Sequence, residues 1–104
     1  MQHINTVPSR EIFPGLHFQL VHGSKSTLSV VTIEKGSILP EHQHPQEQIT
    51  WVMEGQLDMI IGGEAFSLTP GMIHVIPGGT LHSAVAVTEV KVVDFFSPAR
   101  DDYR

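Results

Sequence analysis

The chain has 104 residues, seven of them His and none Cys, and its formal net charge is −5 with neutral histidines. The lack of Cys excludes disulfides, thiolate metal sites and cysteine nucleophiles, which leaves imidazole, carboxylate, amide and hydroxyl groups as ligands or catalysts. The six basic residues are scattered singly, which argues against a nucleic-acid partner. Neither a signal segment nor a membrane-spanning run is recognisable, so we expect a cytoplasmic protein with no membrane partner.

This length predicts one domain, residues 1–104, with an N-terminal arm of about residues 1–15, a barrel of about residues 16–97 and a short C-terminal tail. After residue 15 the chain consists of short apolar runs separated by Gly and Pro, without a long stretch of helical period. Runs at this spacing favour an all-β sandwich or barrel over an α/β fold.

The predicted strands follow one another closely along the chain. A β-branched run is expected as a strand within residues 26–36, and residues 56–68 read as two strands around a Gly62-Gly63 hairpin turn. Further strands are expected within residues 70–79, 82–87 and 90–96, and residues 98–104 form a polar tail or a short helical turn.

The last predicted strand places a carboxylate on its inner side. Side chains two residues apart share one face of a strand, so Asp94 shares a face with Val92 and Phe96. Lys91 marks the opposite face as the outer one. A carboxylate on the apolar interior is costly unless it is paired, hydrogen-bonded or protonated, so Asp94 is a candidate functional residue.

A histidine cluster is the main candidate site. His42 and His44 are two residues apart, so an extended segment would point both imidazoles at one metal ion. Gln48 could add an amide oxygen, and His82, which opens a strand after a tight turn, is the best candidate for a fourth ligand. On spacing alone, a polar loop rich in histidine remains the alternative. Ordinary structural roles are expected for His3, His17, His22 and His74.

The spacing around this cluster resembles the first motif of the cupins. That motif has a glycine, five residues, His-x-His, three residues, a carboxylate or glutamine, six residues and a second glycine. Gly36, His42, His44, Gln48 and Gly55 match it in register.

The segment "GMIHVIPGGTLH" resembles the second cupin motif, with matches at Gly71, Pro77, Gly79 and His82. Ala86 stands where this motif commonly has asparagine. The resemblance implies a double-stranded β-barrel, or jelly roll, that holds one divalent ion per chain, of Zn, Ni, Mn, Fe or Cu. Its implied ligands are His42, His44, Gln48 and His82. Because Gln48 is neutral where glutamate is usual, the ion would keep its full double charge.

Both ends of the chain resemble the small single-domain cupins of uronate breakdown, the KdgF type. In that group an Asp-x-Phe-xxx-Arg pattern contributes to the active site, and it is matched here at Asp94, Phe96 and Arg100. The resemblance implies an isomerase-type enzyme that converts unsaturated uronate monomers from pectin or alginate into the linear keto form. Asp94 would act as general acid or base, Phe96 as a wall for the sugar, and Arg100 as the anchor of the substrate carboxylate.

Three alternatives remain open from the sequence. Asp94 and Arg100 could form a salt bridge that closes the barrel end. Three histidines with one oxygen ligand could instead hold the redox metal of a dioxygenase. The domain could also be a non-catalytic sugar-binding or sensing cupin.

The strand that follows the histidines also bears on assembly. If Gln48 points inward, then Ile49, Trp51 and Met53 point outward and form an exposed apolar row. The N-terminal segment could cover this row, or a second copy of the chain could. We expect a homodimer through this face.

Overall fold

The computed structural model describes residues 1–104 and contains ten strands and two short 3-10 turns. In chain order the elements are η1 (Ile4–Thr6), β1 (Ser9–Phe13), β2 (Leu16–His22), β3 (Thr27–Ile33), β4 (Ile38–His42), β5 (Glu47–Glu54), β6 (Leu57–Ile61), β7 (Glu64–Leu68), β8 (Ile73–Ile76), β9 (His82–Ala86), β10 (Val90–Ser97) and η2 (Asp101–Tyr103). No helix of this structure has the length and apolar character needed to cross a membrane.

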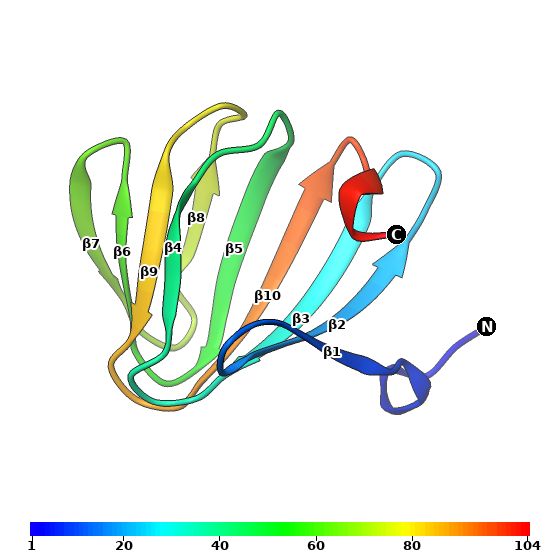
Figure 1. The fold of residues 1–104 in the computed structure, drawn as a ribbon, viewed down its shortest axis with the longest axis horizontal. Helices are drawn as coiled ribbons and strands as arrows, with labels where there is room; N and C mark the ends of the chain where they lie inside the picture. Colours follow the sequence, from blue (N-terminus) through cyan, green and yellow to red (C-terminus); the bar gives the residue numbers. More distant parts are fainter.

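The strands form two antiparallel sheets. The larger has the order β1-β2-β3-β10-β5-β8, and the smaller has the order β4-β9-β6-β7. Figure 1 shows β7, β6, β9 and β4 on one side of the molecule and β10, β3 and β2 on the other. Strands that are neighbours in a sheet but distant in sequence, such as β3 and β10, define the crossovers of a jelly roll. The expected all-β barrel is confirmed.

The N-terminal segment expected as an arm contains strand β1. This strand pairs with β2 across the turn at Pro14 and Gly15, and Gly15 has φ +79°, which favours glycine. Gln19 on β2 donates hydrogen bonds to the carbonyls of Ile4 and Val7 and ties the preceding residues to the same sheet. The N-terminal segment therefore extends the larger sheet at its β2 edge.

The barrel interior is apolar over most of its length. Alternating burial along β3 and β6 turns every second side chain inward, and the apolar ones among them join a cluster of 14 buried hydrophobic residues. Leu16, Val52 and Ile76 are nearly inaccessible. Each such side chain contributes about 1.5–3 kcal/mol by leaving water, so the core provides much of the stability without a bound ligand.

Towards one end of the barrel the inner face becomes polar. On the larger sheet, Asp94 of β10 is the cross-strand neighbour of Ser29 on β3 and of Thr50 on β5. All three point inward, and Ser29 and Thr50 are buried. This polar row forms the floor of the site described below.

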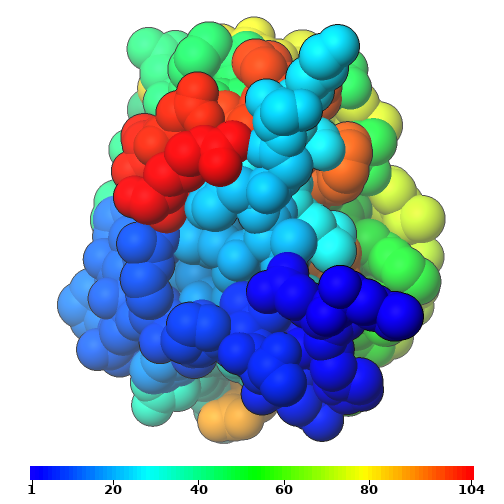
Figure 2. All heavy atoms as spheres, turned by 90° about the vertical axis from the view of Figure 1, so that its right-hand side faces the viewer, coloured from blue at the N-terminus to red at the C-terminus, as the bar shows by residue number.

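The C-terminal tail packs over this polar end instead of leaving the barrel. Ala99 and Arg100 are buried. Gln46 donates a hydrogen bond to the Ala99 carbonyl at 3.1 Å, and the Arg100 amide donates to the Thr27 hydroxyl at 2.9 Å. Figure 2 shows the tail lying beside the β2–β3 turn, where Arg104 donates to the Gly23 carbonyl.

Candidate functional site

Three imidazoles converge at the polar end of the barrel. His42 ends β4, His44 follows in the next loop, and His82 opens β9 as the cross-strand partner of His42. Their ring centroids are 4.2 to 5.7 Å apart, and ligand atoms of all three lie within 4.8 Å of one another. The structure therefore brings together the three histidines that the two sequence motifs singled out.

The backbone orients all three rings in the same way. Each ring places its Nδ1 2.8 to 3.1 Å from a carbonyl oxygen two residues away along the chain. A carbonyl only accepts hydrogen bonds, so each Nδ1 carries the proton and each Nε2 keeps a free lone pair. The carbonyls belong to Pro40, Gln46 and Thr80.

The Nε2 atoms lack the partners that a metal-free site would need. His82 Nε2 is buried and has no hydrogen-bond partner. His44 Nε2 lies 3.0 Å from Gln48 Oε1, so two acceptors face each other. The Gln48 amide cannot turn over without loss, because its Nε2 donates to Thr50 Oγ1 and Asp94 Oδ1. A cation shared by these lone pairs resolves both conflicts, so the site fits a divalent metal ion.

Burial keeps the imidazoles in the form that binds metal. It lowers the pKa of His82 to about 4. Burial, and then the charge of Arg100, also lower the pKa of His44. Neutral rings therefore present their lone pairs at neutral pH, and a metal need not displace protons from them.

The loop before β9 is packed tightly against the loop that carries His44. The Gly79 amide donates to the His44 carbonyl at 2.8 Å, and a Cβ on Gly78 would lie only 2.2 Å from the Pro45 carbonyl oxygen. Only glycine at position 78 allows this approach. The contact fixes the loop that carries His44 against the residues leading to His82.

Asp94 lies beside the imidazoles and is joined to them through Gln48. Its Oδ1 accepts hydrogen bonds from Thr50 at 2.8 Å and from Gln48 at 3.2 Å. Burial raises the pKa of Asp94 to about 6, although these hydrogen bonds and Arg100 act in the opposite direction. Asp94 is thus a carboxyl group that changes protonation state near neutral pH.

Phe96 connects the imidazoles to Arg100. The Phe96 ring meets the His44 ring edge to face at 5.5 Å between centroids, and Arg100 Cζ lies 4.7 Å from the centre of Phe96. Arg100 Cζ also lies 4.0 Å from the centre of the Tyr103 ring. The guanidinium therefore contacts two aromatic rings at the edge of the site.

Arg100 pairs with the tail, and the salt bridge to Asp94 considered from the sequence does not form. Its Nε and Nη2 donate to the two carboxylate oxygens of Asp102 at 3.0 and 2.9 Å. Asp102 and Tyr103 were not predicted from the sequence as neighbours of the site. Their only signal was closeness to Arg100, because the tail has no periodicity that shows which way a side chain points.

A cavity links these groups with the barrel interior. Of its 15 lining residues 11 are hydrophobic, and the polar ones come from both parts of the site. They are His42, Gln48, Asp94 and Arg100. An apolar pocket with a few converging polar groups is the usual form of a small-molecule site.

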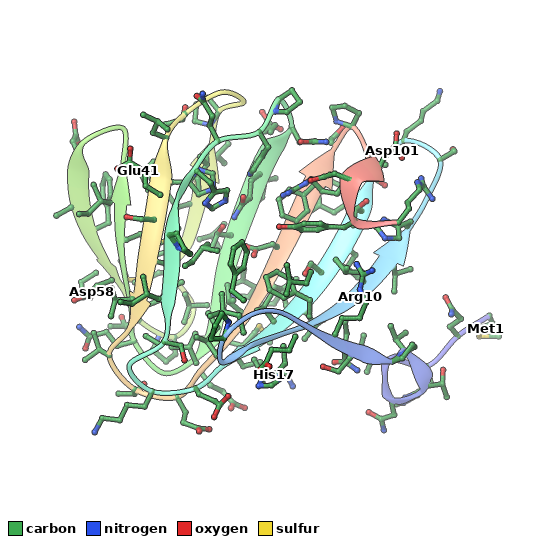
Figure 3. All side chains as sticks on the ribbon, in the orientation of Figure 1. Met1, Arg10, His17, Glu41, Asp58 and Asp101 are labelled. Atoms are coloured by element: carbon green, nitrogen blue, oxygen red, sulfur yellow. The ribbon has the colours of Figure 1, made fainter.

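The other four histidines lie away from this cluster. His17 Nε2 is 3.0 Å from a Glu34 oxygen and 3.6 Å from a Glu11 oxygen. In Figure 3 His17 lies at the end of the molecule opposite Asp101 of the tail. His3, His22 and His74 contact Asn5, Thr27 and Phe66, respectively.

Comparison with known proteins identifies the family. Residues 29–96, which include all three histidines and Gln48, match the family model described as Cupin domain. The chain belongs to the cupin family. This cupin is 30% identical over 99 residues to the pectin degradation protein KdgF of Dickeya dadantii (strain 3937), with 92% of this chain and 90% of that protein covered.

Two solved cupin structures are also similar. KdgF from Halomonas sp. has a TM-score of 0.87 and 32% identity, over 93% of this chain and 91% of that one. An RmlC-like cupin from Shewanella frigidimarina has a TM-score of 0.94 and 27% identity, over 100% of this chain and 95% of that one. The predicted resemblance to the KdgF-type cupins is confirmed.

Proposed function

We propose that this cupin is an enzyme that converts 4,5-unsaturated uronate monosaccharides, from pectin or alginate, to the linear 4-deoxy-5-keto-uronate. The observation that carries the proposal is that His42, Asp94 and Arg100 line one cavity, with His44 and His82 clustered beside His42. The two similar proteins named KdgF, one of them a pectin degradation protein, support the substrate class.

The proposed reaction is an isomerisation and needs no redox partner. The bond between the anomeric carbon and the ring oxygen breaks, the anomeric hydroxyl loses its proton, and an aldehyde forms. The ring oxygen takes up a proton and becomes the hydroxyl of an enol, which then loses its proton while the neighbouring alkene carbon gains one. Proton removal and proton delivery are therefore the tasks that side chains must perform.

Asp94 is suited to both tasks. Its Oδ1 is held by two hydrogen bonds from Thr50 and Gln48, which leaves Oδ2 for proton exchange with a substrate. Because burial brings the pKa of Asp94 to about 6, both protonation states are accessible near neutral pH. Asp94 would take the proton from oxygen and return one to carbon.

Arg100 and Phe96 would bind the sugar. The planar guanidinium can bind a carboxylate with two parallel hydrogen bonds, and every uronate carries a carboxylate. The buried Phe96 ring supplies an apolar wall between Arg100 and His44. A divalent ion of Zn, Ni, Mn, Fe or Cu, held by His42, His44, Gln48 and His82, would supply Lewis acidity towards a substrate oxygen.

The experiment that tests this function follows the ultraviolet absorbance of the substrate double bond. Metal-loaded protein should remove the absorbance of an unsaturated uronate monomer far faster than heat-inactivated protein. Asp94→Asn should abolish turnover while the metal content stays unchanged. Equal rates for native and heat-inactivated protein would reject the proposal. Dioxygen uptake with iron or copper, absent with nickel or zinc, would point to a dioxygenase instead.

We also propose that the enzyme is a homodimer. Ile49 is half-buried, and Trp51 and Met53 are exposed on the outer side of β5, while Ile73 and Val75 of β8 and Phe95 of β10 extend this surface. We call these six residues the outer apolar face. The N-terminal segment, which is tied to Gln19, leaves Trp51 42% exposed. Two copies related by a two-fold axis would cover each other's outer apolar face.

A further inference from the structure

We propose that Asp102 and Tyr103 are positioning residues that hold Arg100 in the orientation needed to bind a carboxylate. The inference rests on the proposed function, in which Arg100 binds the substrate carboxylate. It concerns two tail residues that donate nothing to the substrate themselves and act only through Arg100.

The hydrogen bonds of Arg100 show how this positioning works. A guanidinium has two edges that can bind a carboxylate, one formed by Nε and one Nη, the other formed by the two Nη atoms. Asp102 occupies the first edge, with bonds of 3.0 and 2.9 Å. The second edge keeps an N–H on each nitrogen. A substrate carboxylate can therefore bind while Asp102 stays in place.

Tyr103 removes the remaining freedom of the guanidinium. The centre of its ring lies 4.0 Å from Arg100 Cζ, and the centre of Phe96 lies 4.7 Å away, so contact with two aromatic rings restricts how the guanidinium plane can turn. Tyr103 is itself fixed, because its ring meets Phe18 edge to face at 6.0 Å and its carbonyl accepts a hydrogen bond from Arg10. Phe18 and Tyr103 also line the cavity.

Burial and charge explain why the ion pair of Arg100 and Asp102 lies at the edge of the site. The Arg100 side chain is only 5% exposed, whereas that of Asp102 is 56% exposed. A buried guanidinium without a partner is costly, so Asp102 keeps Arg100 stable in the site before a substrate arrives. The substrate then binds a guanidinium whose direction is already set, and loses less entropy on binding.

The test compares two neighbouring aspartates of η2. Asp102 pairs with Arg100, whereas Asp101 pairs with Arg104, which makes Asp101→Asn the matched control for Asp102→Asn. Binding of galacturonate and of its uncharged methyl ester to metal-loaded protein would be measured by calorimetry. We expect Asp102→Asn to weaken galacturonate binding about tenfold, the scale of one charge-assisted hydrogen bond. Binding of the ester should be unchanged, and Asp101→Asn should change neither.

Two conservative variants separate positioning from folding. Asp102→Glu and Tyr103→Phe keep the carboxylate and the ring, so both should retain most of the preference for galacturonate over the ester. Tyr103→Leu, which removes the aromatic ring, should lose this preference. In the uronate assay, Asp102→Asn should raise KM much more than it lowers kcat, because Asp102 does not take part in proton transfer.

Other outcomes would overturn the inference. Tighter galacturonate binding by Asp102→Asn would show that Asp102 competes with the substrate for Arg100. Equal weakening for acid and ester would show that Asp102 has a purely structural role. A wild type that binds acid and ester equally would show that Arg100 does not bind the carboxylate, and would also overturn the inference. A wild type that prefers galacturonate yet leaves the unsaturated uronate unchanged would reject the reaction but keep the inference.

Discussion

Gln48 donates a hydrogen bond to Asp94 at 3.2 Å while its amide oxygen faces His44, so one side chain joins the two halves of the site. The orientation of the amide follows from this double contact. Oxygen points to the imidazoles and nitrogen points to the carboxylate. A carboxylate in place of Gln48 would have no donor for Asp94, so the neutral residue suits both neighbours.

Gln48→Glu should place two carboxylates in contact. One of them would then hold a proton, because two like charges at hydrogen-bond distance cannot both ionise. In metal-free protein we expect the variant to lose stability, relative to wild type, as the pH rises from about 5 to about 8. Thermal unfolding of the metal-free variant and wild type across this pH range tests the prediction. A constant difference in melting temperature would contradict the prediction.

The raised pKa of Asp94 predicts a pH-dependent stability. Because the folded-state pKa is about 6 and the ordinary value is 3.8, the folded protein binds this proton more tightly than the unfolded chain does. Stability is therefore lost as the pH rises from the ordinary value through about 6. Metal-free Asp94→Asn should be more stable than wild type near pH 8, with the advantage vanishing below about pH 4.

Asp58 provides a control of opposite sign. Hydrogen bonds from Ser67 and Gln56 lower the pKa of this exposed carboxylate. Its stabilising contribution is present above the unfolded-state pKa and is lost as the pH falls through the folded one. Asp58→Asn should thus be slightly less stable than wild type near pH 8 and equal to it in acid. If the stabilities of Asp94→Asn and Asp58→Asn, relative to wild type, changed with pH in the same direction, the opposite directions of the two pKa shifts would be refuted.

His82→Ala should remove metal from the protein. His82 supplies a buried Nε2 that has no other partner, and its loss leaves a less complete ligand set. After dialysis against metal-free buffer, elemental analysis should find far less metal in the variant than in wild type. His3→Gln, which removes an exposed histidine, should retain the wild-type content. Equal metal in both variants would exclude His82 as a ligand.

Gly78→Ala should disturb the site through the backbone. The added methyl group would lie 2.2 Å from the Pro45 carbonyl oxygen, so the loop carrying His44 must move. We expect a loss of about 1–3 kcal/mol in the free energy of unfolding, the usual cost of overpacking, together with weaker metal binding. Gly23→Ala is the matched control, because its methyl group would meet no atom closer than 3.4 Å. Denaturant titration of both variants checks the prediction.

The outer apolar face predicts a dimer that a charge can break. Trp51→Glu would place a carboxylate in the proposed interface, where it has no partner, and should shift the protein towards monomer. Light scattering at micromolar concentration should give twice the chain mass for wild type. Ile60→Glu, on an exposed position of the smaller sheet, should stay dimeric. A monomeric wild type would reject the dimer.

Sequence periodicity predicted the inner face of the barrel because side chains alternate between inside and outside along strands such as β3 and β5. The alternation of β10 places Asp94 inward, and that of β5 places Gln48 and Thr50 on the same side. The tight turn before His82 made it a candidate ligand, and the resemblance to the second cupin motif associated it with His42, its cross-strand partner in the structure.

The tail could not be predicted in this way. Its path depends on contacts between residues distant in sequence, such as Gln46 with Ala99 and Arg100 with Thr27, and no repeat precedes them. Strand β1 was missed for a related reason. It is a short edge strand whose side chains do not alternate between buried and exposed, so it carries no period-two signal.

The three imidazoles are aimed by main-chain carbonyls at positions 40, 46 and 80. Every residue type brings a carbonyl, so the identity of the side chains at these positions is unconstrained by this task. Sequence drift there would leave the tautomer and direction of each ring intact as long as the turns keep their shape. The site can thus persist among relatives whose loops share few residues. At these three positions such relatives should resemble one another more in backbone path than in side-chain identity.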